Sequence, residues 1–149
     1  MVEAVLRDTG LPAERLELEI TESVLIVSVE TVAATLKSLA EIGVSIALDD
    51  FGTGFSSLSY LTTFPFNKIK IDKSFVDELV TGSEVTPIIR MIIGLGRSLN
   101  ATITAEGIET SNQHALLRAA GCHQGQGYFY GKPSPEIPDL GDRTADIFA

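Results

Sequence analysis

The chain has 149 residues, a length that suits one domain or a piece of one. Its 20 acidic residues outnumber its 11 Lys and Arg residues, so the net charge is −9 at pH 7, and hydrophobic residues make up 44%. This balance argues against disorder, and the negative charge predicts no binding to nucleic acid or to an anionic membrane surface. The one cysteine, Cys122, cannot form an internal disulfide, and no apolar stretch approaches the ~20 residues that cross a bilayer. We therefore expect a cytoplasmic domain without direct membrane insertion.

Short runs typical of strands alternate with runs typical of helices. Alternating apolar residues predict a strand over Leu16–Thr21, and apolar residues at helical spacing then predict a helix over Val29–Ile42. Two further strands are predicted over Val44–Leu48 and Lys68–Asp72. A Gly/Ser-rich loop and a short amphipathic segment separate these two strands.

The second half of the chain continues the alternation. A proline at the first position opens a predicted helix over 87–99, and a strand is predicted over Ala101–Ala105. A capping box begins the next helix at Thr110, and this helix closes at Gly121. A last strand is expected within Gln126–Tyr130. Such alternation with short connections predicts parallel strands covered by helices, either as a doubly wound sheet or as a TIM-type barrel.

Acidic residues recur where the predicted strands end. They are Glu19 and Glu22 at the first strand, Asp49 and Asp50 at the second, Asp72 at the third and Glu106 at the fourth. Because the carboxyl ends of parallel strands meet at one edge or one mouth, we expect these side chains to converge. Converging carboxylates repel one another unless a cation or raised pKa values compensate, and oxygen ligands favour Mg²⁺ or Mn²⁺. Lys70 is the basic residue at these strand ends, where it would position a water molecule or balance charge. Mg²⁺ in a carboxylate cup typically serves phosphoryl chemistry.

Each of these residues also has an interpretation without a catalytic role. A single Asp or Glu at a strand end commonly caps a helix or faces solvent. Asp49 and Asp50 next to Phe51 suit a simple turn, and Lys70 would be a surface lysine whose stem covers apolar atoms. Cys122 is most simply a small buried residue. The joint pattern, rather than any one residue, favours a metal site.

Five segments in a fixed order resemble the EAL-type cyclic-di-GMP phosphodiesterase domain of bacteria. They are Glu19-Ile-Thr-Glu22-Ser, Asp49-Asp50-Phe-Gly-Thr-Gly-Phe-Ser-Ser-Leu, Lys70-Ile-Asp72-Lys-Ser-Phe, Ala105-Glu106-Gly-Ile-Glu109-Thr and Gln126-Gly-Tyr. The resemblance covers the chain from about Leu11 to Pro133. It implies an α/β fold, here a partial TIM-type barrel of about five parallel strands with covering helices. It also implies hydrolysis of cyclic di-GMP to linear pGpG with Mg²⁺ or Mn²⁺.

The resemblance assigns a role to each site residue. It implies that Glu19 and Asp49 bind metal and that Asp50 serves a second ion. Lys70 would hold or polarise the attacking water, and Glu106 would act as base or as a second-ion ligand. Supporting positions near this centre are Glu22, Asp72, Glu109 and Gln126.

In the family, the Glu-Ala-Leu segment with its metal-binding Glu and a metal-binding Asn both precede these motifs, and residues 1–149 contain neither. We therefore expect residues 1–149, with a tail over 134–149, to be the C-terminal part of one EAL domain. The expected partners are cyclic di-GMP and either a second copy in a homodimer or upstream signalling domains. The loop over 50–58, anchored by Glu22, would couple the metal site to dimerisation.

Three functions stay open at this point. The chain is part of an active phosphodiesterase, a non-catalytic cyclic-di-GMP-binding or regulatory module, or a general metal phosphoesterase. A barrel of about five strands would also leave sheet edges and apolar surface uncovered. We therefore expect exposed apolar surface or self-association.

Overall fold

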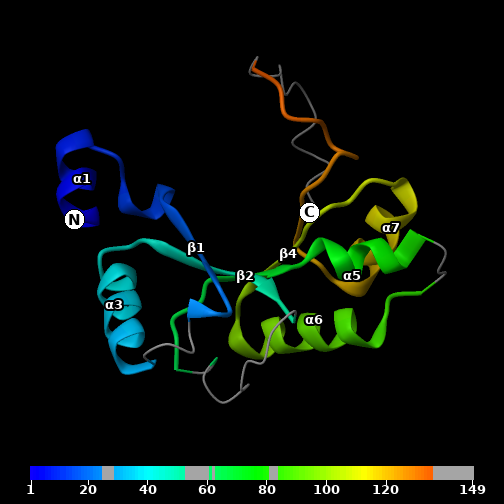
Figure 1. The fold of residues 1–149 in the computed structure, drawn as a ribbon, viewed down its shortest axis with the longest axis horizontal. Helices are drawn as coiled ribbons and strands as arrows, with labels where there is room; N and C mark the ends of the chain where they lie inside the picture. Colours follow the sequence, from blue (N-terminus) through cyan, green and yellow to red (C-terminus); the bar gives the residue numbers. More distant parts are fainter. Residues whose placement is uncertain (25–28, 53–60, 62, 81–83, 136–149) are drawn as a thin grey trace.

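The computed structural model describes residues 1–24, 29–52, 61, 63–80 and 84–135, and its centre is one five-stranded parallel sheet (Figure 1). The strands are β1 (Glu17–Thr21), β2 (Ser45–Phe51), β3 (Lys68–Ile71), β4 (Thr102–Ala105) and β5 (Gln124–Gly125). Their order in space is their order in the sequence. A doubly wound sheet reverses its strand order, so the consecutive order confirms the TIM-barrel type.

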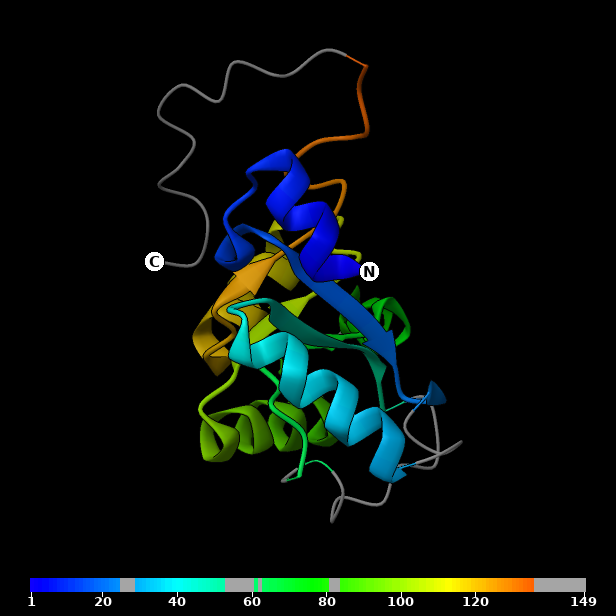
Figure 2. The same cartoon turned by 90° about the vertical axis from the view of Figure 1, so that its left-hand side faces the viewer.

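Helices lie around the sheet, with the first before β1 and the others after strands (Figure 2). They are α1 (Val2–Thr9), α3 (Val29–Glu41), α5 (Lys73–Asp77), α6 (Pro87–Leu99) and α7 (Ser111–Ala120), with short 3-10 turns η1 (Ala13–Arg15) and η2 (Glu78–Val80). The predicted capping box is present, because Thr110 accepts from the backbone N–H of Gln113. Helix α6 lies against β3 and β4, and α3 lies against β2. Within the described residues, no helix combines the length and apolarity needed to span a bilayer.

The two faces of the sheet differ in chemistry because side chains alternate along each strand. Fully buried residues on one face build the core between sheet and helices: Ile46, Leu48, Ile69, Ile71 and Ile103. Polar residues on the other face line a shared pocket: Glu17, Glu19, Lys68, Lys70, Thr104 and Gln124. One face of the sheet is therefore polar along the strands, and it includes Glu19 and Lys70.

The structure excludes one alternative interpretation of the strand ends and shows that one strand prediction is wrong. Strand β2 continues through Asp49 and Asp50 to Phe51, so these two residues do not form a simple turn. The last strand is Gln124–Gly125 and not within Gln126–Tyr130, because its two residues pair with Thr104 and Ala105, where β4 ends. Beyond that pairing the chain turns, and the backbone N–H of Tyr130 donates to the carbonyl of Gly127.

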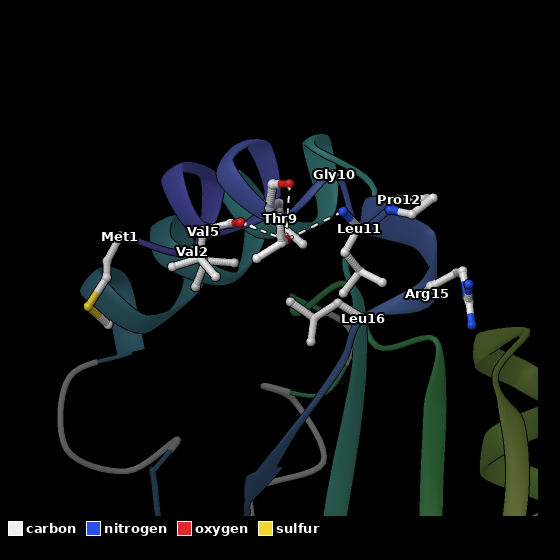
Figure 3. Close-up of a pocket in the computed structure, with 10 residues that line it drawn as sticks. Met1, Val2, Val5, Thr9, Gly10, Leu11, Pro12, Arg15 and Leu16 are labelled. Atoms are coloured by element: carbon white, nitrogen blue, oxygen red, sulfur yellow. Dashed lines mark hydrogen bonds between the residues drawn. The ribbon is translucent and has the colours of Figure 1, made fainter.

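Apolar side chains of α1 and of the segment that leads to β1 surround an open hollow of about 650 Å³ (Figure 3). Val2, Val5, Leu11 and Leu16 point into this space, and Val5 is 55% exposed. The hollow agrees with the exposed apolar surface that the strand count predicts. The tail over 136–149 lies outside the described residues.

Replacing Val5 and Leu11 with serine should lower the fluorescence of the dye ANS bound to the chain, because both side chains line the hollow. Met91→Ser is the control, since Met91 is also exposed but lies on α6 away from the hollow. An equal decrease in the control would contradict dye binding at this site.

Helix α6 approaches β4 most closely at Gly96. A Cβ atom there would lie 2.0 Å from Cδ1 of Ile103, and Ile103 is fully buried. A Cβ at Gly94, two residues earlier on the exposed side of the same helix, would meet nothing within 4 Å. The absence of a side chain at Gly96 therefore sets the distance between helix and sheet.

We expect Gly96→Ala to lower the free energy of unfolding by about 1–3 kcal/mol through overpacking. Gly94→Ala makes the same chemical change and should raise it by up to about 1 kcal/mol, because alanine favours the helix. Urea unfolding of both variants measures the difference. Equal effects would show that the close contact does not govern stability.

Candidate functional site

Lys70 lies at the centre of the site, among carboxylates from three other strands or strand ends. Its Nζ is 2.7 Å from Oε1 of Glu19 on β1 and 2.7 Å from Oε1 of Glu106 after β4. It is also 3.1 Å from Oδ1 of Asp49 on β2. The lysine side chain is only 6% exposed. The structure thus brings together four predicted site residues that are far apart in the sequence.

These contacts decide the charge of the buried amine. Burial alone would lower the pKa of Lys70, but the hydrogen bonds to Glu106 and Glu19 and the contact with Asp49 outweigh it and raise the pKa above its ordinary value. Lys70 is therefore a cation at neutral pH. It is not a surface lysine, and it offsets part of the repulsion among the carboxylates.

A one-residue irregularity in β2 brings Asp49 and Asp50 to the same site. The pairing with β3 runs from Leu48↔Ile69 to Phe51↔Ile71, so β2 has one extra residue at this point. Asp50 accordingly has a positive φ of 52°, a conformation that Asp tolerates better than most residues. Strict alternation would turn these neighbours to opposite faces. The irregularity places both carboxylates near Glu106 instead.

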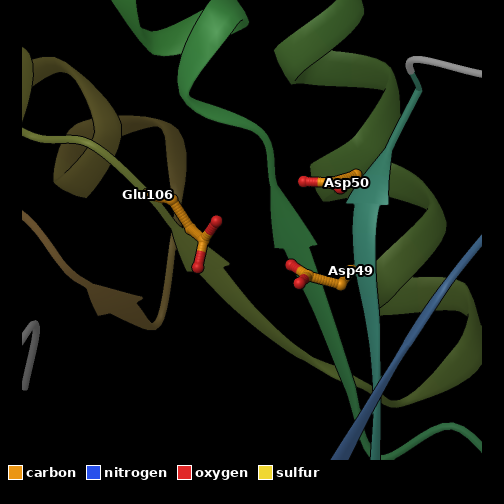
Figure 4. A group of neighbouring side chains, drawn as sticks. All are labelled: Asp49, Asp50 and Glu106. Atoms are coloured by element: carbon orange, nitrogen blue, oxygen red, sulfur yellow. The ribbon is translucent and has the colours of Figure 1, made fainter.

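The carboxylates of Asp49, Asp50 and Glu106 form a group that suits a divalent cation (Figure 4). One oxygen of each lies within 4.8 Å of the others. Oδ1 of Asp49 is buried and, among the described residues, has no hydrogen bond, although the Lys70 ammonium lies 3.1 Å away as an ion-pair partner. A buried carboxylate oxygen without a hydrogen bond is costly, and a hard cation such as Mg²⁺ or Mn²⁺ would add to the compensation that the Lys70 ammonium gives it. The donor set therefore fits the predicted metal.

The pKa of Asp50 reflects the burial and the mutual repulsion of these carboxylates. Burial first, and then the neighbouring carboxylates of Asp49 and Asp72, raise its pKa above the ordinary value. Glu19 contacts Lys70 and is not one of the three grouped carboxylates. Its assignment as a metal ligand stays a prediction, as do the individual roles of the other site residues.

The predicted supporting residues have different surroundings. Glu22 is buried, and its Oε2 accepts from the backbone N–H of Gly52 at 3.4 Å. It thus contacts the start of the predicted loop, whose residues 53–58 lie outside the described residues. Asp72 caps α5, and hydrogen bonds from Ser74, first of all from its hydroxyl, lower the pKa of this carboxyl. Gln126 lines the polar pocket with Glu19 and Lys70.

Several residues of this region were not predicted from the sequence. Lys68 pairs with Glu17 at 2.7 Å, one step further along the polar face from Lys70 and Glu19. The alternation of Glu17 with Glu19, and of Lys68 with Lys70, was the available signal for this second pair. Lys73, which pairs with Glu109 at 2.7 Å, had no such signal.

Comparisons with known proteins give matches over most of the chain. The family model described as "EAL domain" matches residues 1–133. An uncharacterized signaling protein of Caulobacter vibrioides is 52% identical over 135 residues, which are 91% of this chain and 17% of that protein. The structure of the PaMucR phosphodiesterase in complex with c-di-GMP has a TM-score of 0.84 and 41% identity, covering 90% of this chain and 54% of that one.

A third similar protein, BlrP1 of Klebsiella pneumoniae, was solved as a manganese/cy-diGMP complex. It has a TM-score of 0.79 and 31% identity, covering 89% of this chain and 34% of that one. The chain thus spans about half of the solved PaMucR chain and less than a fifth of the Caulobacter relative. The likeness extends over nearly all of the described residues of this chain.

Replacing Lys70 with methionine should destabilise the chain by about 3 kcal/mol in the presence of a chelator, because it leaves buried carboxylates without their cation. Lys68→Met is the matched control on the same face of β3, where the lysine has one ion-pair partner, Glu17, among the described residues. We expect that control to cost less than about 1 kcal/mol. Urea unfolding with EDTA measures both, and equal losses would contradict a special role for Lys70.

Proposed function

The chain belongs to the EAL domain family, and from this premise we propose that its site hydrolyses cyclic di-GMP to linear pGpG with the help of Mg²⁺ or Mn²⁺. The observation that carries the proposal is the convergence of Glu19, Asp49 and Glu106 on the buried ammonium of Lys70, with Asp50 beside them. The cyclic-di-GMP complexes of PaMucR and BlrP1 support the choice of substrate, and the manganese in BlrP1 supports the choice of cofactor.

The metal would be held by Asp49 and Asp50, with Glu19 as a further predicted ligand, and Glu106 lies close enough to be a ligand of a second ion if it is not the base. When bound, a divalent cation neutralises phosphate charge and lowers the pKa of a coordinated water. Lys70 has the charge and the central position to hold an attacking water and to stabilise negative charge on phosphate oxygens. Glu106 is the carboxylate placed to accept the proton of that water.

Hydrolysis of one phosphodiester bond at this site consumes one water molecule. Its oxygen bonds to phosphorus, the bond from phosphorus to one ribose oxygen breaks, and the released alkoxide takes up a proton. Glu106, once protonated, is a source of that proton.

The cellular setting is part of the same proposal. Cyclic di-GMP is an internal second messenger of bacteria, so the proposed activity belongs in the cytoplasm. Relatives such as the oxygen sensor protein DosP of Escherichia coli are several times longer than the part that this chain matches. We therefore propose that the domain acts with upstream signalling domains or as a homodimer.

With Mg²⁺ or Mn²⁺, the chain should convert cyclic di-GMP to pGpG, and Glu106→Gln and Lys70→Met should each lower the rate by at least about 100-fold. Glu30→Gln and Lys37→Met on the exposed side of α3 are matched controls and should keep the wild-type rate. Chromatography of the nucleotides measures product formation.

Three other outcomes would each overturn this proposal. Binding of cyclic di-GMP without turnover in the wild-type chain would identify a non-catalytic binding or regulatory module. Cleavage of bis(p-nitrophenyl) phosphate at a comparable rate would identify a general metal phosphoesterase. Full activity in EDTA would exclude a role for the metal.

A further inference from the structure

The segment that carries Glu106 runs beside the end of β3. The backbone N–H of Glu106 donates to the carbonyl of Ile71 at 3.1 Å, and Ile71 directly follows Lys70. The two residues whose side chains meet in the site are therefore on neighbouring backbones. Any shift of the segment over 106–109 would move the Glu106 carboxylate relative to Lys70.

Lys73 covers this segment from the first turn of α5. A Cβ atom at Gly107 would lie 2.3 Å from Cγ of Lys73, so the lysine stem fills the space over that residue. The ammonium lies 2.7 Å from Oε1 of Glu109 and 2.9 Å from Oδ1 of Asp77. Lys73 thus contacts Gly107 with its stem and Glu109 with its charge, on the side that follows Glu106.

A second, buried connection holds the far end of the same segment. Gln113 is 1% exposed, and its side-chain oxygen accepts from the backbone N–H groups of Glu109 and Thr110. Its side-chain nitrogen donates to the carbonyl of Val76 in α5. This connection fixes residues 109 and 110 to α5. Nearer to Glu106, the side chain of Lys73 packs over Gly107.

We propose that Lys73 is a positioning residue that holds the 106–109 segment on α5 and thereby fixes the Glu106 carboxylate against Lys70 and Asp49. The effect of Lys73 on catalysis rests on the proposed function. Its structural part, the hold on the segment, does not depend on metal or nucleotide. The two parts are therefore tested separately.

The competing explanation is an ordinary exposed ion pair. The side chains of Lys73 and Glu109 are 46% and 48% exposed, and such pairs contribute little to stability. Charge alone also predicts the opposite sign for metal binding, since removing the Lys73 cation would strengthen the attraction of a divalent cation. A positioning role predicts weaker binding. The sign of the change therefore decides between the two.

The first measurement is amide hydrogen exchange in the metal-free chain. Lys73→Ala should speed exchange over residues 106–109 by about tenfold, because the cover and the ion pairs are both lost. Lys73→Met keeps most of the stem and should have a smaller effect. Lys37→Ala, at an exposed position of α3, should leave the segment unchanged. Unchanged exchange in Lys73→Ala would overturn the proposal.

The second measurement is the affinity for Mn²⁺, followed by calorimetry. Lys73→Ala should weaken binding by about tenfold, as for other groups that orient a metal ligand. Lys73→Met and Glu109→Gln should each weaken it, and the double variant should be no weaker than the worse of the two. Unchanged or tighter binding in Lys73→Ala would overturn the proposal. A wild-type chain that binds no Mn²⁺ would instead refute the proposed function, while the exchange data would still decide whether Lys73 holds the segment.

Discussion

One buried ammonium group, that of Lys70, makes the polar end of this sheet possible. Three carboxylates lie within 3.1 Å of its nitrogen, and without it their mutual repulsion would oppose the approach of the strand ends. The lysine is fixed in turn by the carboxylates, which keep it charged despite its burial. The lysine and the carboxylates therefore stabilise one another, because burying any one of these charges without the others would be unfavourable.

The carboxylates at the strand ends have the same chemistry and different surroundings. Asp72 accepts hydrogen bonds at Oδ1 from the backbone N–H and the hydroxyl of Ser74 at the start of α5, as acidic residues before a helix commonly do. Asp49, on the neighbouring strand β2, keeps a buried oxygen without a hydrogen bond among the described residues. This difference separates a carboxylate that builds the fold from one that remains able to bind a cation.

Much of this architecture follows from the periodicity of the sequence. The two-residue alternation in Lys68–Ile71 and Glu17–Thr21 predicts which side chains share the polar face, and consecutive strands with short connections predict the parallel sheet. The position of β5 could not be predicted in this way, because only two residues pair, and the end of β4 determines which two. Periodicity also could not predict that the side chains of Asp49 and Asp50 lie close together. Their approach depends on an extra residue in β2 that is visible only in the pairing with β3.

The left-handed backbone at Asp50 limits which amino acids can serve at this position. Glycine would adopt the conformation most easily but would remove the carboxylate, whereas glutamate would keep the charge and fit the backbone less well. Aspartate tolerates the positive φ and also keeps the carboxylate. Asparagine tolerates the same φ but is uncharged. Few substitutions are therefore compatible with this position. Those that fit the left-handed backbone better than aspartate remove the anionic group.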